Sequence, residues 1–298
     1  MTSSMPPPIV DPTRLHDAVI DWFGRAARDL PWRRDATPWA VMVSEFMLQQ
    51  TPVARVLPVY EAWLERWPTP ADLAAEPAGE AVRAWGRLGY PRRALRLHAA
   101  ATAIVEGHGG QVPTSPEDLR ALPGVGEYTA AAIISFAHGG RAVVMDTNIR
   151  RVLARVVTGV EFPAAAVTAA ERELATSLLP AERAHVWAAA TMELGALVCT
   201  ARSPQCQVCP VAQMCRWRAA GHPAHDGPPR RGQSWEGTDR QCRGRLMAVL
   251  RDATGPVAKA ALDVVWPDAA QRERALDALV ADGLVEPLED ETYALPGT

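Results

Sequence analysis

Four cysteines fall within 17 residues of this chain, in the pattern Cys199-x6-Cys206-x2-Cys209-x5-Cys215. Thiolates this close in sequence can bind one inorganic centre without help from distant residues. The pattern lacks the paired CxxC units and the histidine that are typical of tetrahedral zinc sites. It suits a compact loop that binds a 4Fe-4S cluster through four thiolates, and a zinc site is the minor alternative. The fifth cysteine, Cys242, lies outside the loop and we expect a plain thiol there.

Buried or disulfide-bonded cysteines are the other interpretation of the pattern. The N-terminus has no signal-peptide layout, which disfavours an oxidising compartment. Free cysteines for a metal centre fit a reducing cytoplasm. No run of 18 apolar residues is present, so we expect no membrane span.

Charge gives no global support for nucleic-acid binding, because the chain of 298 residues carries −3. Residues 234–298 hold 7 basic and 12 acidic residues, a balance of −5, so the preceding part carries about +2. Any DNA-binding surface must therefore be a local patch.

The length allows two domains. From Arg14 to Gly221, apolar residues recur at helical spacing, with proline and glycine between the segments. We expect four parts: a disordered N-terminal extension (1–13), a helical domain (14–220), a linker rich in Gly and Pro (221–237) and a small C-terminal domain (238–298).

The C-terminal segment has the pattern of a winged helix. We predict helices and short strands in this order: helices at 240–251, 256–264 and 268–282, then strands at 284–286 and 292–295. Because this winged-helix-like α+β domain is acidic, we favour a protein partner or a packing role for it over DNA binding.

Residues 114–138 predict a helix-hairpin-helix. Ser115 is a natural N-cap for a short helix. The Leu-Pro-Gly-Val-Gly turn that follows contains Gly124 and Gly126, which permit a tight turn before a helix that starts at Glu127. The N–H groups at such a helix start can bind a DNA phosphate without reading the base sequence. A glycine-rich turn between two core helices is the alternative.

Asp146 follows four apolar residues and precedes Thr-Asn-Ile-Arg-Arg, so it lies at the start of a helix. It can be a reactive carboxylate, an ordinary N-cap, or both.

The hairpin, Asp146 and the cysteine loop, in this order and spacing, resemble the endonuclease III superfamily of DNA glycosylases over about residues 15–218. The resemblance implies a mostly α, helix-hairpin-helix glycosylase with a 4Fe-4S cluster loop at 199–215. It also implies a monomer that acts on double-stranded DNA in base excision repair, in the cytoplasm and associated with the nucleoid. The cluster is then expected to shape the loop rather than to transfer electrons.

Tyr128 occupies the position where bifunctional members of that superfamily carry a lysine nucleophile. Residues 1–233 contain no lysine, and Lys259 is the only one in the chain. A lysine Schiff base is therefore not available in the glycosylase body. We expect an enzyme that removes a base without strong lyase activity.

The run Val43-Ser-Glu-Phe-Met-Leu-Gln-Gln-Thr51 resembles the signature of the MutY family of adenine DNA glycosylases. That family removes adenine mispaired with 8-oxoguanine or guanine after flipping the base. Adenine leaves readily only once a ring nitrogen is protonated. Glu45 has apolar neighbours, and burial would raise its pKa and let it act as the general acid. Asp146 would stay ionised and stabilise the sugar cation or bond to it.

The resemblance also assigns roles to residues around these two carboxylates. Tyr128 and Asn148 are expected beside the flipped nucleotide as catalytic residues. The remaining residues are expected in the adenine pocket (Arg28, Trp32, Arg33), in the base stack or at the opposite base (Gln50, Thr51, Tyr90), and at a DNA phosphate (Gly124, Gly126). Core packing is the alternative for Gln50 and Tyr90. Ala189 stands where a polar pocket residue is expected, which puts that contact in doubt.

The sequence departs from the MutY pattern in one respect, and it leaves two alternative functions open. Many MutY-like proteins continue into a Nudix-like domain that helps to recognise 8-oxoguanine, and residues 238–298 are too few for that fold. A mismatch glycosylase that removes thymine opposite guanine shares the tyrosine and the cluster loop, although the Glu45 run argues against it. A non-catalytic iron–sulfur DNA-binding protein is the third option.

Overall fold

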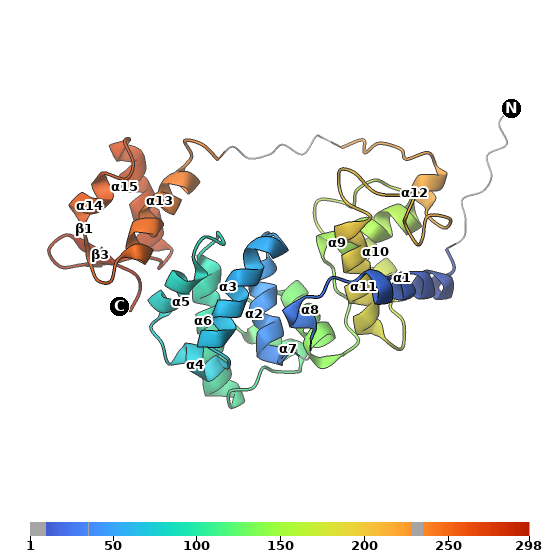
Figure 1. Ribbon diagram of the computed structural model, residues 1–298, viewed down its shortest axis with the longest axis horizontal. Coiled ribbons are helices and arrows are strands. Elements are labelled where there is room, and N and C mark those ends of the chain that lie inside the picture. Colours follow the sequence, from blue (N-terminus) through green and yellow to red (C-terminus); the bar gives the residue numbers. More distant parts are fainter. Residues whose placement is uncertain (1–9, 35, 228–234, 298) are drawn as a thin grey trace. The chain divides into compact units, whose positions relative to one another are not determined.

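The computed structural model describes residues 10–34, 36–227 and 235–297 (Figure 1). These residues are mostly helical and divide into two compact units. Unit 1 takes residues 1–38 and 126–229, and unit 2 takes residues 39–125 and 230–298. The mostly α fold class is confirmed, while the domain boundaries drawn from composition stay a prediction. Most of the predicted N-terminal extension lies outside the described residues, and the first helix begins at Pro12.

Unit 1 contains mainly helices, in this order: α1 (Pro12–Ala26), the 3-10 helix η1 (Pro31–Arg33), α8 (Glu127–His138), α9 (Thr147–Leu153), the π-helical turn η2 (Ala154–Thr158), α10 (Ala169–Ser177), α11 (Ala184–Leu197) and α12 (Arg216–Ala219). Among the described residues, no helix of either unit combines the length and apolar character that a membrane span requires.

The core of unit 1 forms where α11 packs against α1 and α9 (Figure 1). Apolar side chains of these helices are buried together with part of α8. The contact between α9 and α11 is close because α11 carries Gly195 there. A Cβ atom at Gly195 would lie 2.6 Å from the Cβ of Asn148, so only glycine fits without a shift of one helix.

Unit 2 begins with six helices: α2 (Pro38–Leu48), α3 (Val53–Arg66), α4 (Pro70–Ala74), α5 (Ala78–Trp85), α6 (Arg92–His108) and α7 (Pro116–Ala121). Three buried tryptophans pack edge to face at its centre, with Trp63 contacting Trp67 and Trp85 at ring distances of 4.6 and 5.7 Å. The helix α2 is buried on all sides from Trp39 to Met47. The polar side chains on α2, Ser44 and Glu45, are therefore held in position by the residues packed around them.

The C-terminal part of unit 2 contains the remaining elements: α13 (Asp239–Asp252), β1 (Val257–Ala258), α14 (Lys259–Asp263), α15 (Ala269–Ala281), β2 (Glu286–Leu288) and β3 (Thr292–Ala294). The three strands form an antiparallel sheet in the order β1-β3-β2. The helix predicted at 256–264 was wrong at its start, because Val257 pairs with Tyr293 and Ala258 with Thr292 as a third strand. A two-residue strand gives no alternating pattern by which sequence could reveal it.

The C-terminal part packs against α5. Arg83 of α5 donates to the carbonyl oxygens of Arg251 and Ala253, the latter at 2.7 Å. The backbone N–H of Gly79 donates to Pro296 O at 2.7 Å. These contacts hold the C-terminal part against residues 39–125, so both segments belong to unit 2.

The predicted start of α7 is confirmed, because the Ser115 side chain accepts a hydrogen bond from Asp118 N at 3.1 Å. The following turn contains Gly124 with φ +80°. A Cβ there would lie 2.8 Å from the Cβ of Arg96 and 3.0 Å from a ring carbon of Phe46. Glycine is therefore required at 124 by conformation and by space.

We expect Gly124→Ala to lower the free energy of unfolding by about 2 kcal/mol or more, since it combines a left-handed backbone with a steric clash. Thermal or urea unfolding of the purified protein measures this. Gly126→Ala is the matched control, because φ is −96° there and nothing lies within 4 Å of an added Cβ. Equal stability of the two variants would contradict the structural account of Gly124.

Candidate active site and metal centre

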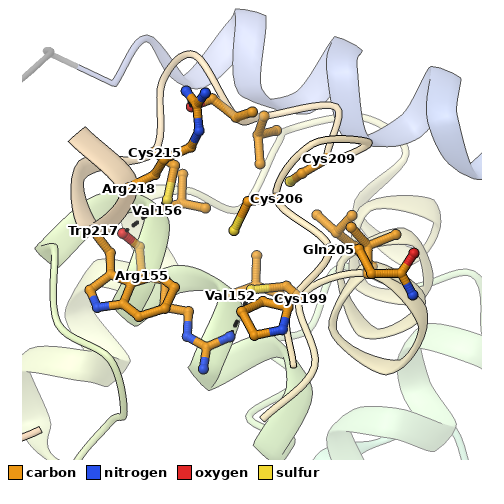
Figure 2. Close-up of a pocket in the computed structure, with 15 residues that line it drawn as sticks. Val152, Arg155, Val156, Cys199, Gln205, Cys206, Cys209, Cys215, Trp217 and Arg218 are labelled. Carbon is orange, nitrogen blue, oxygen red and sulfur yellow. Dashed lines mark hydrogen bonds between the residues drawn. The ribbon is translucent and has the colours of Figure 1, made fainter. Parts of the chain in front are cut away.

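The four cysteines of the loop line a single pocket in unit 1 (Figure 2). All five cysteines of the chain are free of disulfide bonds. Within the described ranges, no three His, Cys, Asp or Glu side chains converge as a single metal ion would require. A cubic cluster offers a separate iron atom to each cysteine, so its ligands lie farther apart than those of one ion.

The electrostatics of the loop fit a cationic iron centre. Burial, together with the neighbouring cysteines, raises the pKa of Cys209 to about 12, against a backbone hydrogen bond that lowers it. Burial also raises the pKa of Cys215. Thiolates in such a place are stable only when they bind a positively charged centre. Cys199, Cys206, Cys209 and Cys215 are the residues that would hold the 4Fe-4S cluster.

Arg155 of the π-helical turn η2 holds the start of the cysteine loop. The residue is 1% exposed, and its guanidinium group donates to Thr200 O at 2.7 Å and to Ala201 O at 3.1 Å. It also contacts Cys199 Sγ at 3.5 Å and lies over the ring of Trp217. A buried cation beside the sulfur positions suits a site whose ligands are anionic.

Asp146 is the N-cap of α9, as the sequence suggested. Its Oδ1 accepts from the backbone N–H of Ile149 at 2.6 Å, and its Oδ2 accepts from Asn148 Nδ2 at 3.0 Å. The residue keeps some exposed surface, but its carboxyl group is enclosed. Burial, the largest influence, raises the pKa of Asp146, while these hydrogen bonds and the charge of Arg151 lower it without cancelling the effect.

A chain of hydrogen bonds leads from Asp146 to the cysteine loop. Asn148 Oδ1 accepts from Arg151 Nη2 at 2.7 Å, and Arg151 Nε donates to Cys199 O at 2.8 Å. Arg151 Nη2 also donates to Gly195 O at 2.6 Å. The structure thus brings Asp146 and Asn148 together and attaches them to the loop. Arg151 could not be singled out from the sequence, since Asp-Thr-Asn-Ile-Arg-Arg offers two arginines and no local feature that distinguishes them.

Glu45 lies on α2 in unit 2 and is 5% exposed, so the burial expected for it is confirmed. Its helix neighbours are apolar and buried as well. Tyr128 lies in the first turn of α8 in unit 1, partly buried against the core of that unit. Glu45 therefore belongs to a different unit from Asp146, Asn148 and Tyr128.

Arg28 and Arg33 meet at a carboxylate that the sequence analysis missed. Glu193 of α11 is completely buried. It accepts from the backbone N and the Nε of Arg28 at 2.9 and 2.8 Å, from Arg28 Nη2 at 2.7 Å and from Arg33 Nη2 at 3.0 Å. Trp32 directly precedes Arg33 in η1 and is 9% exposed. The sequence signal for Glu193 is a single acidic residue within an otherwise mostly apolar helix.

Glu193 is a permanent anion at neutral pH. Burial would raise its pKa, but the hydrogen bonds from Arg28 and Arg33 outweigh burial and lower the pKa to about 2. A depressed carboxyl pKa contributes stability that is complete above the unfolded value, near 4.5, and is lost as the pH falls toward 2. At pH 7 the contribution is therefore fully present.

Gln50, Thr51 and Tyr90 come together in unit 2 on two adjoining turns. Thr51 is buried, and its hydroxyl donates to Gln49 O at 3.2 Å and lies 3.4 Å from Leu88 O. Gln50 and Tyr90 are both exposed. Gly126, where an added Cβ would meet nothing, is the N-cap residue of α8 in unit 1.

Two family models and several named proteins match this chain. Residues 43–175 match the HhH-GPD superfamily of base excision DNA repair proteins, and residues 199–215 match the iron–sulfur binding domain of endonuclease III. A protein of Mycobacterium tuberculosis named adenine DNA glycosylase is 51% identical over 98% of this chain and 97% of its own length. A protein of the same name from Mycolicibacterium smegmatis is 52% identical over 94% and 95%.

The chain belongs to the adenine DNA glycosylase family. Because the M. tuberculosis relative matches 98% of the chain, the similarity extends into the C-terminal segment. Among solved structures, a thermostable thymine-DNA glycosylase superposes with a TM-score of 0.64 and 26% identity, covering 69% of this chain and 95% of that one. The chain is thus a DNA glycosylase by family, and the match to the iron–sulfur domain confirms the assignment of the 4Fe-4S cluster to residues 199–215.

We expect Cys206→Ala to lose the iron and the visible absorbance of the cluster, since one of four thiolate ligands is removed. Iron analysis and absorbance spectra of the purified protein measure this. Cys242→Ala is the matched control, because Cys242 is buried in α13, outside the loop. Loss of iron in the control, or normal iron in Cys206→Ala, would contradict the ligand assignment.

We expect Glu193→Gln to lower the free energy of unfolding at pH 7 by about 3 kcal/mol, because two arginines lose a buried anionic partner. Urea unfolding at matched iron content measures the change. Glu76→Gln serves as control, since Glu76 pairs with Arg66 on the surface and such pairs contribute about 1 kcal/mol or less. A Glu193→Gln protein as stable as the control would show that the buried pair is not needed.

Proposed function

We propose that this protein is a monofunctional adenine DNA glycosylase that removes adenine mispaired with 8-oxoguanine or guanine. The observation that carries the proposal is a buried glutamate on α2, together with a carboxylate that caps α9, in a chain 51% identical to a protein named adenine DNA glycosylase. Two carboxylates in different surroundings are the usual arrangement for cleaving a glycosidic bond.

Glu45 acts as the general acid in the proposed reaction. It protonates a ring nitrogen of the flipped adenine, and the electrons of the glycosidic bond then pass to the base as it leaves. Its fixed place on a helix buried on all sides supports this role, because a general acid must be held at one position.

Asp146 stabilises the positive charge that develops on the sugar, either through space or by forming a bond that water later breaks. The donors from Asn148 and Ile149 hold the carboxylate in one orientation. Burial raises its pKa in the free protein, so the acidic limb of activity lies at a higher pH than for an ordinary aspartate. The sugar cation favours the ionised form.

Tyr128 lies beside the flipped nucleotide and takes no covalent part in the reaction. Since residues 1–233 lack lysine, no Schiff base forms in the glycosylase body and the strand stays intact. Arg28, Trp32 and Arg33 line the adenine pocket, and Glu193 holds the two arginines in place.

The remaining predicted contacts are with the DNA duplex. Gln50, Thr51 and Tyr90 occupy the stack or contact the base opposite adenine, and the exposure of Gln50 and Tyr90 supports this. Gly124 and Gly126 form the hairpin that binds a phosphate. The iron–sulfur cluster gives its loop a fixed shape for DNA contact. The C-terminal segment serves as a contact for a protein partner or packs against the rest of its unit, and the enzyme acts in the cytoplasm at the nucleoid.

A second candidate is removal of thymine opposite guanine. The superposition with a thymine-DNA glycosylase favours it as the alternative. The same experiment tests both candidates.

We expect the wild-type protein to release adenine opposite 8-oxoguanine and opposite guanine, with strand breaks only after alkali. Duplexes with adenine opposite thymine and thymine opposite guanine should stay intact. Borohydride should trap no lysine adduct.

We expect Asp146→Asn to lower the single-turnover rate of adenine release by at least about a hundredfold while leaving DNA affinity unchanged, because it removes the stabilising charge.

Release of thymine would establish the alternative. Activity in Asp146→Asn close to the wild-type rate would overturn the proposed mechanism. DNA binding without release of any base would favour a non-catalytic role.

A further inference from the structure

Arg93 lies in the first turn of α6 and is 6% exposed. Its guanidinium group joins two turns of unit 2. Nη1 donates to three carbonyl oxygens at the end of α2: those of Phe46 (2.8 Å), Met47 (3.1 Å) and Gln49 (2.6 Å). Nη2 donates to Thr51 Oγ1 and to Gly89 O, each at 3.0 Å. One side chain therefore connects the turn after α2 with the turn before α6.

The positive charge of Arg93 is stabilised by backbone carbonyl dipoles and by two aromatic rings. Within the described part of the chain, no carboxylate forms an ion pair with it. The carbonyl groups at the C-terminal end of α2 carry the negative end of the helix dipole. The rings of Trp85 and Tyr90 lie 5.2 and 5.6 Å from the guanidinium carbon. Burial lowers the pKa of Arg93 to about 10, so it stays a cation at neutral pH.

Both turns contain a non-glycine residue in the left-handed region. Gln50 has φ 55° and Tyr90 has φ 48°. Such backbone is strained and persists only where the surroundings hold it. The hydrogen bonds from Arg93 to Gln49, Thr51 and Gly89 lie directly beside these two residues. Gln50 and Tyr90 are both exposed, Tyr90 by 51%.

We propose that Arg93 is a positioning residue that holds Gln50 and Tyr90 in one fixed arrangement for insertion at the mismatch. This inference rests on the proposed function of Gln50 and Tyr90 at the base stack. It assigns the conformation of both inserted residues to a single buried cation.

Lysine cannot replace Arg93 in this role. The guanidinium group presents five donors in a rigid fork and reaches both turns at once, whereas an ammonium is a single point with three donors. Without Arg93, the carbonyl groups of Gln49 and Gly89 lose a donor, and the left-handed turns lose the contact that connects them. Gln50 and Tyr90 then move independently, and base extrusion becomes slower.

The test is a double-mutant cycle between Arg93 and Tyr90 in the full-length protein with its cluster. The variants are Arg93→Gln, Arg93→Lys, Tyr90→Ala and the double variant Arg93→Gln/Tyr90→Ala. Single-turnover rates are measured on duplexes with adenine opposite 8-oxoguanine and opposite guanine. Affinity is measured with a duplex that carries a non-cleavable adenosine analogue. Arg66→Gln is the matched control, an arginine of the same unit whose ion pairs lie at the surface.

We expect Arg93→Gln to lower the excision rate about tenfold, and Arg93→Lys to give little rescue. In the Tyr90→Ala background, the same change should lower the rate by only about threefold, because the part of its effect that passes through Tyr90 is gone and the part that passes through Gln50 remains. Iron content and thermal stability are compared for each protein, at an assay temperature well below every unfolding transition. Arg66→Gln should match the wild type.

A structural role alone would give effects that multiply, so that Arg93→Gln lowers the rate equally with and without Tyr90. That result, or full rescue by Arg93→Lys, would overturn the inference while leaving the proposed function standing. A wild-type protein that releases adenine from neither duplex would instead overturn the proposed function, and the inference with it.

Discussion

Buried arginine side chains that donate to backbone carbonyl groups hold the functional segments of this protein in place. Arg151 and Arg155 attach the cysteine loop to α9 and η2, and Arg93 connects two turns in unit 2. Each uses the planar, branched donor group that lysine lacks. In a chain with a single lysine, fixed loop geometry therefore depends on guanidinium groups, and the cost of burying each charge is offset by several oriented carbonyl dipoles.

The two carboxylates assigned to catalysis are held by different means. Glu45 lies in the middle of a helix whose neighbours are all buried, so packing determines its position. Asp146 lies at a helix start, where N–H groups and Asn148 orient it. A third carboxylate, Glu193, is equally buried but carries a strongly depressed pKa because two arginines surround it. Burial alone therefore does not determine whether a carboxyl group is ionised, and for Glu193 the two arginine partners determine it.

Much of the site could be predicted from the sequence because it resides in local patterns. The cysteine spacing, the Ser115 cap and the Asp146 cap involve residues a few positions apart, and the structure has each where expected. Glu193, Arg93 and Gly195 could not be found this way. Their roles depend on distant partners, 44 positions apart for Arg93 and Gln49 and 165 positions apart for Arg28 and Glu193, and nothing in a single sequence reports such pairs. The strand β1 was missed because two residues are too few to show a period.

The left-handed backbone at Gln50 and Tyr90 limits which side chains can be presented to DNA at all. β-Branched residues are disfavoured there by contact between Cβ and the backbone, whichever base they would meet. Asparagine, aspartate and glycine fit the conformation most easily, but glycine has no side chain to insert. The range of residues available for reading a mismatch is therefore narrowed first by chain conformation and only afterwards by chemistry. A substitution at Gln50 or Tyr90 therefore changes how easily the backbone adopts the left-handed conformation as well as the side chain that meets the DNA.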